Sequence, residues 1–110
     1  MPNTYKILGQ SNPNAATLTE LYPVPGSTQV IVSTITICNR SAVPTSFRIS
    51  FQINNAGDSN EQYIAYDQPI GGNEMIPLRK LGITLGAGDT INVYATLATL
   101  SFQAFGVEIT

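Results

Sequence analysis

The chain has 110 residues, of which 43% are hydrophobic and only 11% are charged, and its formal net charge is −2. This length suits one domain, and low charge with an ordinary apolar content argues against disorder. The chain has five Lys and Arg residues and seven Asp and Glu residues, which argues against a nucleic-acid-binding surface. It has no histidine, so zinc sites and Ser-His-Asp triads lack one of their usual residues.

The N-terminal segment predicts no export signal and no membrane insertion. Residues 1–6 lack a positively charged stretch followed by an apolar one, and the longest apolar runs are too short for a membrane span. A short strand is expected over residues 5–8, so residues 1–10 are predicted to be an N-terminal arm or edge strand and residues 11–110 a β-sandwich domain. If the arm is a strap, its deletion should abolish particle binding and leave the fold intact.

Segments rich in β-branched residues, separated by Gly, Pro, Asn and Asp, follow one another along the chain. They predict strands over residues 17–22, 29–38, 47–54, 62–67, 75–78 with 81–85, 90–97 and 99–109. The predicted fold is all-β, a single antiparallel β-sandwich of seven to eight strands, either jelly-roll or Ig-like.

The first strong strands carry clear inward faces. The early part of 29–38 is apolar on both parities, as in a doubly covered central strand or a wall against a neighbouring chain. Cys38 is expected to be a small buried hydrophobe. In 47–54, every second residue from Phe47 to Ile53 is apolar, which predicts one face on the core.

The C-terminal strands differ in regularity. In 90–97 the inward residues are expected to be Ile91, Val93, Ala95 and Leu97. The last segment changes parity, from Leu100, Phe102 and Ala104 to Phe105, Val107 and Ile109, which predicts a β-bulge near 104–105.

No group of residues predicts catalysis. The seven acids fall mostly in predicted turns or at strand ends, and no pair is nominated for acid–base chemistry. The oxygen ligands of 58–61 do not follow calcium-loop spacing, and the Gly86-x-Gly88 turn precedes a strand rather than a helix. We therefore expect no enzyme activity, no cofactor and no metal.

Exposed aromatic and basic residues form the candidate interaction surface: Tyr5, Tyr63, Tyr66, Tyr94, Arg79 and Lys80. Tyr94 should face outward, whereas Tyr63 and Tyr66 have opposite parities, so one of the two should face outward. Arg40, Arg48, Arg79 and Lys80 are candidates for ion pairs with a neighbouring subunit. For Arg79 and Lys80 an edge-strand charge that opposes aggregation is an equal alternative.

Several stretches together resemble a family of small tailed-phage proteins. They are 21–29, 32–41 and 47–49 in the first half, 63–67 and 81–89 in the middle, and 93–95 with 100–109 at the end. The turn at 23–27 and the Arg79–Lys80 pair depart from the family's pattern.

The resemblance implies a non-enzymatic bacteriophage virion structural protein, either tail-fibre-like or capsid-associated. We expect an oligomeric surface module, as a trimer, on the tail or tail fibre. One alternative is a capsid decoration (cement) protein that clamps capsomers. Another is a carbohydrate-binding β-sandwich module that uses Tyr63 or Tyr66 with Asp67 and Asn73. Expected partners are copies of the chain, other virion proteins and a host surface glycan, and the expected location is the virion.

Overall fold

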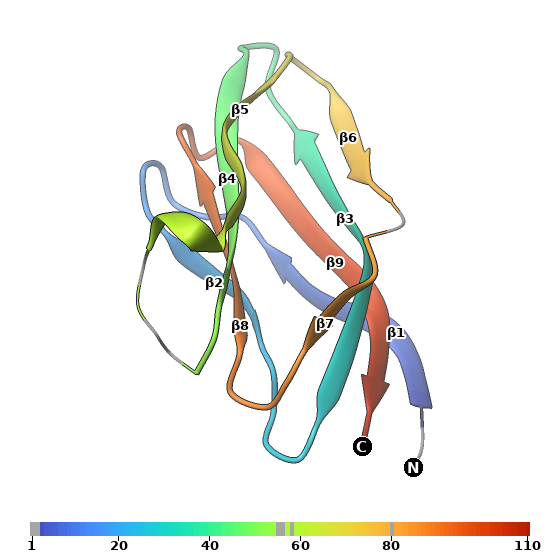
Figure 1. The fold of residues 1–110 in the computed structure, drawn as a ribbon. Coiled ribbons are helices and arrows are strands. Elements are labelled where there is room, and N and C mark those ends of the chain that lie inside the picture. Colours follow the sequence, from blue (N-terminus) through green and yellow to red (C-terminus); the bar gives the residue numbers. More distant parts are fainter. Residues whose placement is uncertain (1–2, 55–56, 58, 80) are drawn as a thin grey trace.

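The computed structural model describes residues 3–54, 57, 59–79 and 81–110. Over these residues the chain forms nine strands and one 3-10 turn (Figure 1). In chain order they are β1 (Asn3–Ser11), β2 (Thr19–Pro23), β3 (Gln29–Asn39), β4 (Thr45–Gln52), η1 (Asn60–Gln62), β5 (Tyr63–Ile70), β6 (Met75–Leu78), β7 (Ile83–Leu85), β8 (Thr90–Ala95) and β9 (Leu100–Ile109).

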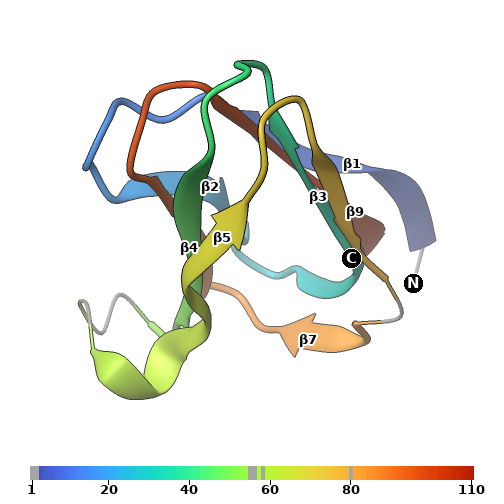
Figure 2. The same cartoon turned by 90° about the horizontal axis from the view of Figure 1, so that it is seen from above.

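The strands build two antiparallel sheets that pack face to face. The larger sheet has the order β1-β9-β3-β6, with β7 also paired to β3, and the smaller sheet has the order β2-β8-β4-β5. Figure 2 shows the two layers from above, with β1 on one side of the molecule and η1 on the other. The predicted all-β sandwich is confirmed. The nine strands of the described residues exceed the predicted seven to eight by one or two. One of the extra strands arises because β6 and β7 occupy successive stretches of the same edge of β3.

The pairing of the strands is nested. β1 pairs with β9, β2 with β8, β3 with β6 and β7, and β4 with β5. These nested pairs are those of a jelly roll, in which one long hairpin folds over into two sheets. β6 and β7 together take one strand position beside β3, so the nine strands fill the eight positions of that fold. Of the two strand orders that the sequence leaves open, the structure has the jelly roll.

The core lies between the sheets and is formed by alternate residues of each strand. Its largest fully buried apolar side chains are Phe47, Phe102, Ile35, Ile37, Ile49, Ile70, Ile91, Leu100, Val30, Val32 and Val93. The rings of Phe47 and Phe102 meet edge to face across the two sheets, with centroids 6.1 Å apart. This geometry is favourable for aromatic pairs and links the central strands β4 and β9.

Two strands end earlier than the sequence pattern predicts. Ile91, Val93 and Ala95 are buried as expected, but Leu97 follows the end of β8 and is exposed. Phe47 and Ile49 are likewise buried, whereas Ile53 follows the end of β4 and is 66% exposed. A turn begins at Asn54, whose φ of 52° lies in the left-handed region, so the alternation no longer applies beyond β4.

β3 is central in its sheet but covered on only one face. Its buried residues change parity from Val30 and Val32 to Ile35 and Ile37, because the register shifts between Val32 and Thr34. Of the two alternatives for its early part, the doubly covered strand is wrong, since Ile31 on the outer face is 38% exposed. The wall against a neighbouring chain stays a prediction. Cys38, which was expected to be buried, is also only partly buried.

β9 keeps one parity throughout, contrary to the prediction. Its buried residues run from Leu100 through Phe102 and Ala104 to Gly106. The irregularity lies opposite Phe105 but on the neighbouring strands, between Ile7 and Gly9 in β1 and between Val32 and Thr34 in β3. The predicted position along the sheet, near residues 104–105, is therefore correct, but the bulges lie on β1 and β3 instead of β9.

Candidate functional site

The outer face of the smaller sheet carries a group that we call the tyrosine–arginine cluster: Arg48, Tyr63, Tyr66, Asp67 and Tyr94. Arg48 on β4 lies directly opposite Tyr94 on β8. The guanidinium carbon of Arg48 is 4.2 Å from the ring centroid of Tyr66 and 4.3 Å from that of Tyr94. Both separations are within cation–π range, so Arg48 holds the aromatic side chains of two other strands in place.

Asp67 completes the cluster by binding the same arginine. Arg48 donates from Nε to Asp67 Oδ1 at 2.7 Å and from Nη2 to Asp67 Oδ2 at 3.4 Å. The bond to Asp67 raises the pKa of Arg48 above its ordinary value, which keeps the guanidinium charged. Because both side chains are partly exposed, the pair contributes little to stability, and its main effect is to orient the rings. Arg48 was a candidate for an ion pair with a neighbouring subunit, and within its own chain it pairs with Asp67.

Tyr63 and Tyr66 lie against each other. Their rings are edge to face with centroids 5.0 Å apart, although strict alternation predicts opposite faces. The alternation fails because β5 shifts register twice against β4, around Ile49, and because Asp67 has a left-handed φ of 52°. The structure thus brings Tyr63, Tyr66 and Tyr94 into one cluster, and Tyr66 remains 56% exposed.

A hollow of about 480 Å³ opens beside this tyrosine pair and is lined by Asn60, Tyr63 and Tyr66. Asn60 reaches it from η1, whose start is stabilised by a capping box between Ser59 and Gln62. Gln62 accepts from the Ser59 N–H at 3.1 Å and donates to the Gly57 carbonyl at 2.7 Å. Asn60 was not among the sequence candidates, although the Ser-x-x-Gln spacing of a capping box was a visible signal.

The outer face of the larger sheet carries a second group, the apolar face: Tyr5, Ile7, Ile31, Phe105, Val107 and Ile109. Val107 lies opposite both Tyr5 and Ile31, and Phe105 lies opposite Ile7. Residues directly opposite in antiparallel strands share a side of the sheet. Tyr5 is 80% exposed and Ile7 48% exposed, so apolar side chains of three strands form one continuous solvent-facing surface.

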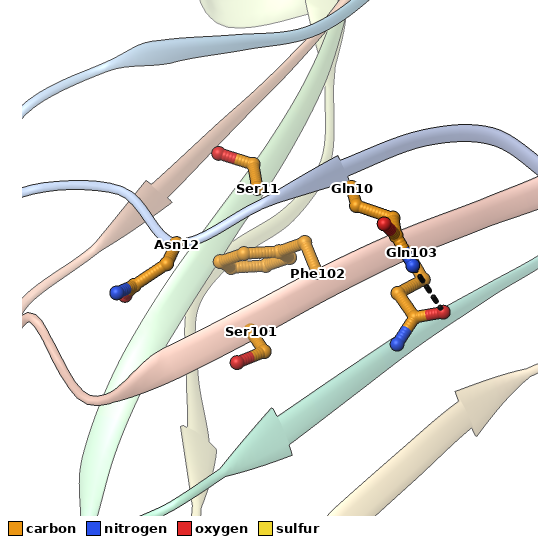
Figure 3. Close-up of a pocket in the computed structure, with 6 residues that line it drawn as sticks. All are labelled: Gln10, Ser11, Asn12, Ser101, Phe102 and Gln103. Atoms are coloured by element: carbon orange, nitrogen blue, oxygen red, sulfur yellow. Dashed lines mark hydrogen bonds between the residues drawn. The ribbon is translucent and has the colours of Figure 1, made fainter.

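Towards the other end of this sheet the outer face becomes polar. Gln10 donates to Gln103 at 3.4 Å, and a hollow of about 320 Å³ is lined there by Gln10, Ser11, Asn12, Ser101, Phe102 and Gln103 (Figure 3). Asn12 accepts a 2.8 Å bond from Arg40, which also donates to the Ala98 carbonyl. Arg40, another candidate for a contact between subunits, therefore has partners within its own chain.

The other sequence candidates lie apart from the tyrosine–arginine cluster. Tyr5 is on β1 of the larger sheet, and Arg79 is exposed after β6. Lys80 lies outside the described residues. Asn73, proposed with Asp67 for sugar binding, is in the turn after the far end of β5, where its N–H donates to the Ser41 carbonyl.

Within the described ranges, no three side chains of His, Cys, Asp or Glu lie close enough together to hold a metal ion. In the same part of the chain, no helix is long and apolar enough to cross a membrane.

No protein-family model and no curated protein matches this chain. Among solved structures, one that matches is a pentameric capsid protein isolated from metagenomic phage sequences. The two chains are 13% identical with a TM-score of 0.40, and the match covers 96% of this chain and 63% of that one. This chain thus spans less than two thirds of the length of that protein. With a TM-score this low, the match assigns no function to this chain.

Proposed function

We propose that this protein is a non-enzymatic structural component of a bacteriophage particle and that it assembles with copies of itself. The phage assignment follows from the sequence resemblance. The observation that supports assembly is the apolar face, because Tyr5, Ile7 and Ile31 expose large apolar side chains side by side on one sheet. Contiguous exposed apolar surface of this kind marks protein–protein contacts.

The charge pattern of the larger sheet favours the same function. None of the paired residues on its outer side carries a charge. These residues run from Asn3, Ile109 and Gln29 at one end of the sheet to Ser101, Cys38 and Met75 at the other. An interface core is typically depleted in charge and enriched in aromatic residues. The face therefore has the composition of an interface core.

The size of the outer face is adequate for a stable contact. The ten residues of β9 extend about 33 Å, and four neighbouring strand positions extend about 19 Å. The resulting footprint of about 600 Å² approaches the roughly 800 Å² that each partner buries in a standard interface. A contact of this size on each copy supports a small oligomer, for which a trimer remains our expectation.

Self-association is tested by sedimentation velocity over a range of protein concentrations. We expect the wild type to associate and Ile7→Glu to weaken association at least tenfold, because the interface would have to bury an unpaired carboxylate. Ile64→Glu is the matched control, since Ile64 is also 48% exposed but lies on β5 of the smaller sheet. A monomeric wild type, or equal weakening by both substitutions, would contradict the proposal.

Within the particle we propose a place on the tail or tail fibre, with capsid decoration as the alternative. The two differ in copy number, which quantitative mass spectrometry of purified virions measures against the major capsid protein. A small fraction of the capsid count supports the tail, and a comparable count supports decoration. Absence of the protein from virions would contradict a structural role in the particle.

A further inference from the structure

We propose that the hollow beside Tyr63 and Tyr66 binds a neutral pyranose sugar. This binding site is separate from the apolar face, which lies on the other sheet, and goes beyond the assembly function. Figure 2 shows η1, the yellow-green helical turn before β5, at the side of the molecule away from β1. A sugar bound there would remain accessible when copies pack through the larger sheet.

The chemistry of the lining suits a sugar. Tyr63 and Tyr66 supply aromatic surface and Asn60 supplies an amide beside it. Small-molecule sites commonly combine aromatic walls with a few polar groups that set orientation. A pyranose fits this pair of properties, because its C–H face stacks on a ring while its hydroxyls bind an amide.

The Tyr66 ring is held in place by its neighbours. Arg48 stacks on it at 4.2 Å, Tyr63 meets it at 5.0 Å, and Asp67 anchors the arginine. An exposed side chain that is ordered before binding loses less conformational entropy when a ligand arrives. The cluster thus keeps a 56% exposed ring in a fixed orientation, which a merely solvated tyrosine would not need.

The charges around the hollow favour neutral sugars. The carboxylate of Asp67 is neutralised by Arg48, whereas Glu61 is the exposed neighbour of Asn60 in η1. The Ser59 hydroxyl bond lowers the pKa of Glu61, which favours the ionised form of this exposed side chain. We expect the charge of Glu61, one residue from Asn60, to disfavour uronic and sialic acids. Arg48, the cation of the cluster, is already engaged by Asp67 and is less able to attract them.

The test is a titration of the ¹⁵N-labelled full chain followed by amide chemical shifts. The probes are methyl β-glucoside, methyl β-galactoside and their β-1,4-linked tetramers, with galacturonic and N-acetylneuraminic acids as acidic comparisons. We expect saturable shifts at Asn60, Tyr63 and Tyr66 with a dissociation constant on the order of 1–10 mM for at least one neutral probe. The acidic sugars should bind at least tenfold more weakly.

Substitutions distinguish stacking from a structural effect. Tyr66→Ala should weaken binding at least tenfold, Tyr66→Phe should retain it, and Asn60→Ala should weaken it severalfold. Val43→Ala is the control, because Val43 is 55% exposed between β3 and β4 and belongs neither to the hollow nor to the apolar face. Dispersed amide spectra establish that each variant is folded. The inference is overturned if no neutral probe gives saturable shifts, if acidic sugars bind equally well, or if Tyr66→Ala binds like the wild type.

Discussion

A single hydrogen-bonded group shows how individual residues join the two sheets. Tyr22 on β2 donates its hydroxyl to Glu108 on β9, and Lys6 on β1 lies 3.3 Å from the same carboxylate. Burial, followed by the bond to Glu108, raises the pKa of Tyr22 above its ordinary value. The same bond lowers the pKa of Glu108. A bond of this kind between a hydroxyl and an ionised carboxylate is stronger than one between neutral groups.

These shifts predict how stability depends on pH. The contribution of Glu108 is present above its unfolded-state pKa and is lost as the pH falls through its lowered folded-state pKa. The contribution of Tyr22 is present below its unfolded-state pKa of about 10 and is lost as the pH rises above that value. We expect Tyr22→Phe to lower the free energy of unfolding at pH 7 by about 2 kcal/mol.

Urea unfolding from pH 3 to pH 11 measures this prediction. Tyr22→Phe should also flatten the loss of stability at both ends of the range, because it removes the titrating phenol and the donor to Glu108. Tyr5→Phe, at an exposed position, should follow the wild-type profile. An unchanged pH profile in Tyr22→Phe would show that the bond to Glu108 does not link stability to protonation.

At the scale of elements, β9 organises the larger sheet because β1 and β3 both pair with it. Each neighbour shifts register opposite Phe105, and the extra residue in β1 is the buried Leu8. Gly106 lies at this point with no room for a side chain, since an added Cβ would lie 2.1 Å from the Ile31 carbonyl oxygen and 3.1 Å from Leu8 Cδ1. The side chain of Leu8 therefore packs in the core where a side chain at position 106 would lie.

This close approach predicts a strong effect of one methyl group. Gly106→Ala should lower the free energy of unfolding by about 3 kcal/mol, because the clash is with backbone and cannot be relieved by a rotamer change. Gly26→Ala is the matched control, since nothing lies within 4 Å of its added Cβ. Chemical denaturation measures both. Equal stabilities of the two variants would contradict the packing inferred for β1, β9 and β3.

At the scale of the whole molecule, the jelly roll brings the two ends of the described chain together. β1 pairs with β9 from Asn3 opposite Ile109 to Ser11 opposite Phe102, and Leu8 contributes to the core. The N-terminal segment is therefore an integral strand of the larger sheet. We therefore expect removal of residues 1–10 to affect the fold, whereas the strap hypothesis expects the fold to stay intact.

Deletion of residues 1–10 tests this difference. We expect the truncated chain to lose cooperative unfolding, because deletion exposes one edge of β9 and the core beneath Leu8. Circular dichroism during thermal unfolding and the dispersion of amide signals measure the effect. A truncated chain that unfolds at the wild-type temperature would support the strap instead.

The local pattern of the sequence was sufficient for the fold class and for much of the core. Alternation in 90–95 and 47–49 correctly predicts the inward residues of β8 and β4, because each strand lies in a regular ladder there. Alternation in 63–67 failed for the tyrosine pair, since β5 is irregular against β4. Register shifts depend on how a strand fits its neighbours, and those neighbours are distant in sequence.

The amino-acid sequence was enough to establish a sparsely charged, all-β sandwich and the approximate position of its strands, because side-chain period and turn chemistry are local properties. The tertiary structure alone decided the jelly-roll order, the location of the bulges on β1 and β3, and the meeting of Arg48 with Tyr66 and Tyr94. Each of these depends on contacts between residues far apart in the chain. Such contacts follow from how two sheets fill one core, which no single segment encodes.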